Sequence, residues 1–234
     1  MKTALITIAT GGIYRDYAIR MFKSAKTFFP PHDAIVFTDS AYLWTRTTIY
    51  TEPKGFPRET LMRYHTMLGA KDVLKDYDQL FWADSDMLFV APVGEEIFAE
   101  ETTRDSGLTA TLHPGYVGTV GTPERDKRSM AYLPFGVQNK YYCGGFQGGS
   151  AKAYLKAMEA MAFCIDKDLA RGITPVWHDE SAWVCYLYFH PPSIVLGPEY
   201  CYPENAGTHY TDKWRAAGLG DVKPRLMALT KAGR

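Results

Sequence analysis

Two aspartates interrupt an apolar, aromatic-rich run of the chain, Phe81–Val90. A short run of this composition predicts a buried β-strand. Asp is disfavoured in strands and is almost never fully buried without a partner. Because side chains at i and i+2 of a strand point the same way, the carboxylates of Asp84 and Asp86 should face one spot. The run therefore predicts a strand that carries two acidic side chains to one place.

This Asp-Ser-Asp sequence has two interpretations. Two like charges side by side repel unless a cation lies between them, and hard oxygen ligands suit Mg²⁺ or Mn²⁺. Alternatively, the strand ends here and the aspartates cap the turn that follows. The spacing alone does not decide between a metal site and a turn, because Asp-x-Asp is a weak motif.

The segments before this run predict an α/β fold. Residues 2–9 and 34–38 are strand-like, and residues 14–29 place apolar side chains at helical spacing before Pro30 and Pro31. A strand, a helix and a strand within about 40 residues are typical of a parallel βαβ unit. The sequence therefore predicts a sheet with parallel strands.

Two later segments extend this prediction. Residues 58–75 predict a helix with an imperfect apolar face, and residues 79–89 predict the strand that carries the aspartates. Ligands of α/β sheets bind beyond the carboxyl ends of the strands, so the turn Thr10-Gly11-Gly12 and the aspartates should share one edge. That edge suits a nucleotide with a metal ion. Because the chain contains no repeat, low-complexity tract or linker, we treat residues 1–234 as a single domain.

Composition excludes some classes of function. The formal net charge is zero, which argues against binding to nucleic acid or an anionic membrane by bulk electrostatics. No apolar stretch is long enough to predict a transmembrane helix. The four cysteines show no metal-binding spacing, which favours reduced thiols and a cytoplasmic location.

A second polar cluster, Trp177-His178-Asp179-Glu180, precedes a predicted helix. The acidic residues would complement the helix dipole there. Alternatively, His178 is a third metal ligand and Glu180 is a nucleophile or base. Both interpretations remain open from the residues alone.

Seven motifs occur along the chain in a fixed order. They are Asp84-Ser85-Asp86, His113-Pro114-Gly115, Glu124-Arg125, Ala131–Gly136 followed by Tyr141-Tyr142, Phe146–Ser150, Trp177–Ser181 and Pro198-Glu199-Tyr200. Together they resemble the family-six retaining glycosyltransferases, which include the histo-blood-group A and B transferases, the α-1,3-galactosyltransferases and short bacterial relatives. The similarity covers nearly the whole chain and implies the GT-A fold, one α/β domain with a mixed, mainly parallel nucleotide-binding sheet.

The resemblance also implies a reaction. Such enzymes transfer GalNAc or Gal from a UDP-sugar in α-1,3 linkage to a β-galactoside, with or without fucose. Asp84 and Asp86 would hold Mn²⁺, or Mg²⁺ in its place, on the UDP diphosphate. Glu180 would lie on the β-face of the transferred sugar, either as a covalent nucleophile or as a carboxylate that stabilises positive charge.

Further contacts follow from the same resemblance. The implied donor contacts are Ala9, Thr10, Gly11 and Tyr14 for the nucleoside, Arg63, Asp84, Gly144, Gly145 and Asp179 around the sugar, and Lys231 on the diphosphate. The implied acceptor contacts are His113, Thr122 and Trp177. Glycine at position 145 leaves room for an N-acetyl group, so we expect UDP-GalNAc to be preferred over UDP-Gal.

The sequence departs from the family after Pro198-Glu199-Tyr200. Tyr202-Pro203 replaces the family's Trp-Asp, whose aspartate contacts the acceptor, and Glu204 could substitute for it. The chain begins at the catalytic strand, so we expect a soluble protein. The alternative is a carbohydrate-binding protein that keeps the fold without turnover. The presence of Asp84, Asp86 and Glu180 argues against that alternative.

Overall fold

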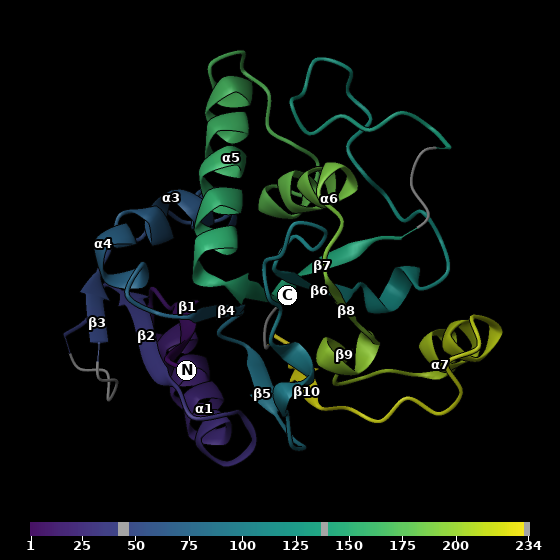
Figure 1. Cartoon of the computed structure of the whole chain (residues 1–234), viewed down its shortest axis with the longest axis horizontal. Helices are drawn as coiled ribbons and strands as arrows, with labels where there is room; N and C mark the ends of the chain where they lie inside the picture. The colour runs from purple at the N-terminus through teal and green to yellow at the C-terminus, as the bar shows by residue number, and fades with distance from the viewer. Residues whose placement is uncertain (42–46, 137–139, 232–234) are drawn as a thin grey trace.

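The computed structural model describes residues 1–41, 47–136 and 140–231, and within them the main sheet has seven strands (Figure 1). Strand β7 pairs antiparallel with β4 and β6, whereas the other neighbours pair parallel. The mixed, mainly parallel sheet implied by the family resemblance is thus confirmed. In spatial order, the strands are β3 (Thr47–Tyr50), β2 (Asp33–Thr38), β1 (Thr3–Ile8), β4 (Gln79–Ala83), β7 (Tyr142–Ser150), β6 (Leu108–Leu112) and β8 (Ile194–Leu196).

Alternating side chains of the central strands supply two hydrophobic layers. Leu5 of β1 belongs to a core with Met21 and Phe22 of α1 (Gly12–Phe28), on one face of the sheet. Its neighbours on β1, Ala4 and Ile6, point to the other face. That second core includes side chains of α3 (Arg63–Leu68), α5 (Ala151–Leu169) and α6 (Asp179–Phe189). Figure 1 shows α1 on one side of the sheet and α5 on the other.

The prediction of a single helix over residues 58–75 is wrong. The structure has three short helices, α2 (Arg58–Leu61), α3 and α4 (Lys71–Leu74). The backbone leaves helical geometry at Met62 (φ −94, ψ 14) and at Ala70 (φ −112, ψ 23). These breaks match the imperfect apolar face, because each short helix can turn its own apolar residues toward the sheet.

The glycine-rich stretch 141–150 contains β7, although its composition does not indicate a strand. A Cβ at Gly148 would overlap the carbonyl oxygen of Leu80, and one at Gly149 would overlap that of Gly107. Glycine is therefore required for neighbouring backbone to approach this closely. β7 lies beside β4, and the N–H of Asp84 donates to the carbonyl oxygen of Gly145 at 2.9 Å.

A small second sheet brings the C-terminal segment beside the aspartates. Its strands, in spatial order, are β5 (Met87–Phe89), β10 (Leu226–Ala228) and β9 (Tyr202–Pro203). The remaining elements are α7 (Thr208–Ala216) and the 3₁₀ helices η1 (Glu95–Ile97), η2 (Pro114–Tyr116) and η3 (Pro198–Tyr200). All four cysteines are free thiols. Within the described ranges, no helix combines the length and apolar character needed to cross a membrane.

Candidate active site

Asp84 and Asp86 lie in a tight turn at the carboxyl end of β4. The strand ends at Ala83, and the N–H of Met87 donates to the carbonyl oxygen of Asp84 at 3.0 Å. The expectation that both aspartates belong to one continuous strand over residues 79–89 is therefore wrong, because this turn separates β4 from β5. Both aspartates nevertheless line one cavity of about 350 Å³. The turn and the shared acidic site are thus one feature.

Arg63, the first residue of α3, is buried among the acidic side chains. Its guanidinium lies 3.0 Å from Oδ1 of Asp84 and 3.1 Å from Oδ2 of Asp179, and donates to the carbonyl oxygen of Gly144 at 2.6 Å. It also stacks on the ring of Trp82 at 4.2 Å. Burial alone would lower the pKa of Arg63, but the charges of Asp179 and Asp84 outweigh it and raise that pKa. One permanent cation therefore joins segments that are far apart in the sequence.

The aspartate pair fits a divalent cation. Arg63 and Trp82 donate to Oδ1 of Asp84, at 3.0 and 2.9 Å, and no described residue donates to its Oδ2. Burial raises the pKa of Asp84, Arg63 opposes that rise, and the charge of Asp86 adds to it. A cation between the carboxylates would relieve their repulsion. Mg²⁺ and Mn²⁺ prefer such oxygens, and Mg²⁺ typically takes one or two carboxylates and completes its coordination with phosphate oxygens and water.

The structure does not bring His178 to this pair, which overturns the alternative of a third protein ligand. Across the described residues, no group of three or more His, Cys, Asp or Glu side chains could hold a metal ion. The imidazole of His178 instead packs edge-to-face on Phe56, with ring centroids 5.4 Å apart. A cation would thus rest on two carboxylates from this chain.

The C-terminal segment places Lys231 beside Asp86. The N–H of Leu229 donates to the carbonyl oxygen of Asp86 at 2.9 Å, next to the pairing of β10 with β5. Nζ of Lys231 lies 3.0 Å from Oδ2 of Asp86 and 5.8 Å from the ring centroid of Tyr14. Burial alone would lower the pKa of Lys231, but Asp86 outweighs it and raises that pKa. An ammonium group next to the acidic pair suits a phosphate-bearing ligand.

Helix α6 begins with two adjacent carboxylates that have different partners. Asp179 faces Arg63, and burial raises its pKa to about 6. Oε1 of Glu180 accepts from the hydroxyl of Tyr141 at 2.8 Å, and Oε2 accepts from the N–H of Gly144 at 2.9 Å. Burial raises the pKa of Glu180 to about 7, although both hydrogen bonds lower it. Glu180 is thus a fixed carboxylate whose charge changes near neutral pH.

Tyr141 belongs to the site, although it was not among the predicted site residues. It lies 39 positions before Glu180, and no spacing rule connects the two. The motif Tyr141-Tyr142, which contains it, was noted only as part of the family resemblance. The structure gives the first of these tyrosines the role of holding Glu180.

The turn after β1 forms another wall of the cavity. Ala9 is fully buried beneath it. Oγ1 of Thr10 donates to Glu59 at 2.7 Å, and the N–H of Gly11 donates to Asp39 at 3.1 Å. Neither acid was predicted: Asp39 directly follows β2, so the strand-end rule could have found it, whereas Glu59 carries no such signal. Three predicted residues line the cavity here, namely Thr10, Gly11 and Tyr14.

Gly144 and Gly145 lie directly beside side chains of the site. A Cβ at Gly144 would lie 3.5 Å from both Nη1 of Arg63 and Oδ2 of Asp179. A Cβ at Gly145 would lie 3.2 Å from Sγ of Cys201, which is tighter than an ordinary contact. Glycine at both positions therefore lets β7 lie close to these side chains.

Three residues predicted to contact an acceptor lie near Glu180 in the sequence or in space. Nε1 of Trp177 donates to Oγ1 of Thr122 at 2.8 Å, which brings these two together. The ring of His113 packs on that of Tyr141, with centroids 5.6 Å apart. Burial lowers the pKa of His113 to about 4, so its imidazole is neutral near pH 7.

Glu204 has a different environment. Its side chain is exposed, and Oε2 accepts from the N–H of Thr230 at 2.7 Å. No described contact joins Glu204 to the other three predicted acceptor residues. The structure therefore shows it fixing the C-terminal segment close to Lys231.

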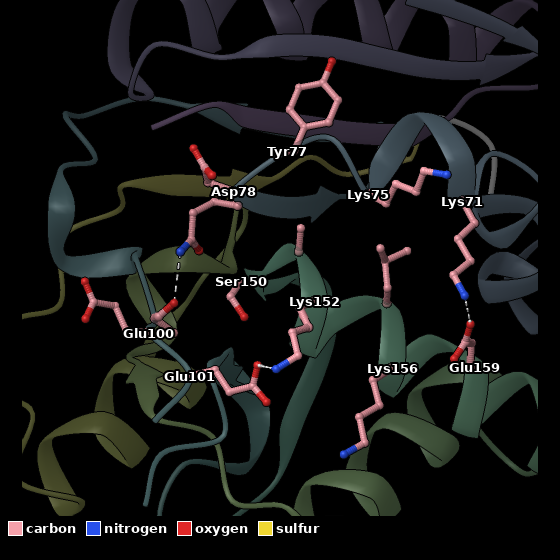
Figure 2. Close-up of a pocket in the computed structure, with 14 residues that line it drawn as sticks. Lys71, Lys75, Tyr77, Asp78, Glu100, Glu101, Ser150, Lys152, Lys156 and Glu159 are labelled. Atoms are coloured by element: carbon pink, nitrogen blue, oxygen red, sulfur yellow. Dashed lines mark hydrogen bonds and ion pairs between the residues drawn. The ribbon is translucent and has the colours of Figure 1, made fainter. Parts of the chain in front are cut away.

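A larger cavity, about 720 Å³, lies at the opposite edge of the sheet (Figure 2). It is lined by residues at the start of β4 and the end of β7, and by charged side chains of α5. Several of these charges pair with one another, such as Lys71 with Glu159 and Lys152 with Glu101. None of the predicted site residues lines this larger cavity, so we place the candidate active site in the smaller one.

Comparison with known proteins identifies a family. A sequence profile described as Glycosyltransferase family 6 matches residues 59–216. That range includes Arg63, Asp84, Asp86, Gly144 and Glu180. It therefore covers most of the charged centre of the site.

Individual relatives are similar over different lengths. Histo-blood group ABO system transferase 1 of Rattus norvegicus is 39% identical over 132 residues, which are 55% of this chain and 36% of the relative. Globoside alpha-1,3-N-acetylgalactosaminyltransferase 1 of Mus musculus is 33% identical over 221 residues, 85% of this chain and 60% of the relative. O-antigen biosynthesis glycosyltransferase WbnI of Escherichia coli is 26% identical over 229 residues, 91% of this chain and 95% of the relative. The match thus spans only about a third of the length of the rat relative.

Proposed function

Because this chain belongs to glycosyltransferase family 6, we propose that it transfers GalNAc, or Gal, from a UDP-sugar in α-1,3 linkage to a β-galactoside. The family takes a nucleotide sugar as donor and a glycan as acceptor, and the mixed sheet agrees with its GT-A fold. The donor, the acceptor, the linkage and the retention of configuration are the proposed part. A cytoplasmic location and a single catalytic domain complete the proposal.

One observation carries this proposal. The cavity-lining residues Asp84, Asp86 and Arg63 lie at the carboxyl edge of the sheet, and Asp179 contacts Arg63. Glu180 is tied to the same stretch of β7 by the N–H of Gly144. A diphosphate site, a sugar-binding pair and a reactive carboxylate are what sugar transfer from a nucleotide requires.

Each part has a chemical task in this proposal. Asp84 and Asp86 would hold Mn²⁺ or Mg²⁺, and the bound ion would supply Lewis-acid stabilisation of a leaving diphosphate. Lys231 adds positive charge beside it. Arg63 and Asp179 hold hydroxyls of the donor sugar, because a buried ion pair retains hydrogen-bonding capacity on both partners.

Glu180 faces the reacting carbon in this mechanism. It acts as nucleophile or as a carboxylate that stabilises positive charge, and both roles require the ionised form. The hydroxyl of Tyr141 and the N–H of Gly144 hold that carboxylate in place. Trp177, Thr122 and His113 bind the acceptor on the side of Glu180.

Donor choice depends on Gly145. A Cβ at this position would lie 3.2 Å from Sγ of Cys201 and 3.7 Å from Oδ2 of Asp84, so an alanine here would crowd both groups. In this proposal glycine at position 145 favours UDP-GalNAc over UDP-Gal, because an N-acetyl group is larger than the hydroxyl it replaces. A pocket difference of this size changes discrimination by about 10- to 200-fold.

A donor-by-acceptor screen tests the proposal. The protein is incubated with Mn²⁺, UDP-GalNAc or UDP-Gal, and galactosides such as lactose and 2′-fucosyllactose. We expect UDP release together with a new saccharide. If no pair yields either product, while calorimetry detects glycan binding that ignores UDP and Mn²⁺, the chain is a carbohydrate-binding protein instead.

A further inference from the structure

The turn that leads into α6 holds a histidine in a backbone conformation that favours glycine. His178 has φ 54 and ψ −122, and across the described residues every other positive φ belongs to a glycine. The N–H of Glu180 donates to the carbonyl oxygen of Trp177 at 3.0 Å. Residues 177–180 thus form a type II′ turn with His178 at its first central position. Glycine is preferred there because a Cβ clashes with the backbone, so this histidine is strained.

The hydrogen bonds of this turn do not use the histidine side chain. The N–H of His178 donates to the carbonyl oxygen of Pro175 at 2.9 Å, and the N–H of Trp177 donates to Oγ of Ser181 at 3.0 Å. A glycine at position 178 would keep these bonds and relieve the strain. The reason for histidine therefore lies in its imidazole.

That imidazole contacts a wall of the active-site cavity. It packs edge-to-face on Phe56, with ring centroids 5.4 Å apart and an interplanar angle of 88°. Phe56, Gly55 and Pro53 line the cavity. Glu59 fixes this segment, because it accepts from the N–H of Lys54 and from Thr10, both at 2.7 Å. The ring of Phe56 is nevertheless 69% exposed.

We infer that His178 and Phe56 form a clasp that holds the segment 53–57 against the start of α6 and closes the cavity around a bound nucleotide sugar. This inference rests on the proposed function. The clasp joins a wall of the cavity directly to the residue before Asp179 and Glu180. A cavity closed at this point excludes water from the reacting sugar, so the clasp favours transfer to the acceptor over hydrolysis of the donor. His178 and Phe56 are positioning residues in this scheme.

Kinetics of four variants test the clasp. His178→Ala and Phe56→Ala should each raise the KM for UDP-sugar about three- to tenfold, as expected for one aromatic contact. Both should leave kcat within about twofold and increase the ratio of donor hydrolysis to transfer. The double variant should be no worse than either single variant, because all three lack the same contact. Phe56→Tyr keeps the ring and should keep the wild-type KM.

Phe163→Ala is the matched control for these variants. Its ring, on α5, is also exposed, at 55%, and we expect no kinetic change. His178→Gly completes the set, because it removes the imidazole together with the strain. It should show the same kinetic defect as His178→Ala, but its Tm should exceed that of His178→Ala by roughly 2–6 °C.

These results separate the clasp from the proposed function. Wild-type KM and hydrolysis ratio in His178→Gly would show that the imidazole is unnecessary and would overturn the clasp. A Tm for His178→Gly no higher than that of His178→Ala would overturn the strain argument. If the wild-type protein turns over no UDP-sugar, the proposed function fails. A cycle of Tm values for His178→Ala, Phe56→Ala and the double variant then still tests the contact, and strictly additive shifts would refute it.

Discussion

Arg63 is the residue whose loss should disturb the site most. Its side chain is 4% exposed and pairs with Asp179, which is 3% exposed, at 3.1 Å. Arg63→Met keeps an apolar stem of similar length but leaves Asp179 buried without a counter-charge. Removing one partner of a buried ion pair destabilises a protein by about 3–5 kcal/mol. We expect a loss of that size in the free energy of unfolding at about pH 8.

The loss should depend on pH in a direction that identifies Asp179. Burial raises its pKa from 3.8 to about 6 even though Arg63 lowers it, so without Arg63 the pKa rises further. A carboxyl with a raised pKa binds more protons in the folded state, so stability falls with rising pH, by about 1.4 kcal/mol per unit. In the wild type, stability stops falling near the pKa of Asp179, about 6, whereas in the variant it continues to fall at higher pH. The difference between the two proteins should therefore widen as the pH rises above that value.

Urea unfolding in the presence of EDTA, followed over a series of pH values, measures this difference. Arg128→Met is the control, because Arg128 pairs with Asp126 at 2.6 Å but is 77% exposed. An exposed pair contributes at most about 1 kcal/mol. A loss in Arg63→Met no larger than in this control, or one that stays constant with pH, would refute the reasoning.

Three further outcomes follow from the site. Glu180→Gln should lower kcat about 10²- to 10⁴-fold while calorimetry still detects UDP binding; loss of UDP binding would make Glu180 structural. In the wild type, kcat should fall as the pH drops below the pKa of Glu180, about 7, because protonation removes the reactive carboxylate. A profile that stays flat through that pH would contradict this role. Gly145→Ala should shift the ratio of kcat/KM for UDP-GalNAc and UDP-Gal toward UDP-Gal by about 10-fold or more, and an unchanged ratio would separate Gly145 from donor choice.

The sequence predicted the parts of the fold that depend on local patterns. The βαβ unit at the start follows from hydrophobic periodicity, and the position of the acidic pair follows from the rule that ligands bind at strand ends, whereas the turn after β4 was only one of two interpretations. The strand β7 was missed because its glycines serve close backbone approach, as at Gly148, and therefore lack the side chains that mark a strand. The break of residues 58–75 into short helices was missed because tertiary packing decides it.

The candidate site was likewise predicted only where local sequence patterns mark it. Asp84, Asp86 and Glu180 stand out because charged residues border apolar segments. Two of the contacts that hold them were not predicted, since those between Tyr141 and Glu180 and between Lys231 and Asp86 join positions far apart in the sequence. The strained turn at His178 is also invisible in the sequence, because it exists only as a backbone conformation.

The anomeric configuration of the product tests the central claim most directly. The protein is incubated with UDP-GalNAc, Mn²⁺ and an accepted β-galactoside, and the new linkage is assigned by proton NMR. We predict an α-linked GalNAc at the 3-position of the galactose, formed together with one UDP per linkage. A β-linked product, or UDP formed with free GalNAc and no new linkage under every acceptor tried, would contradict the account.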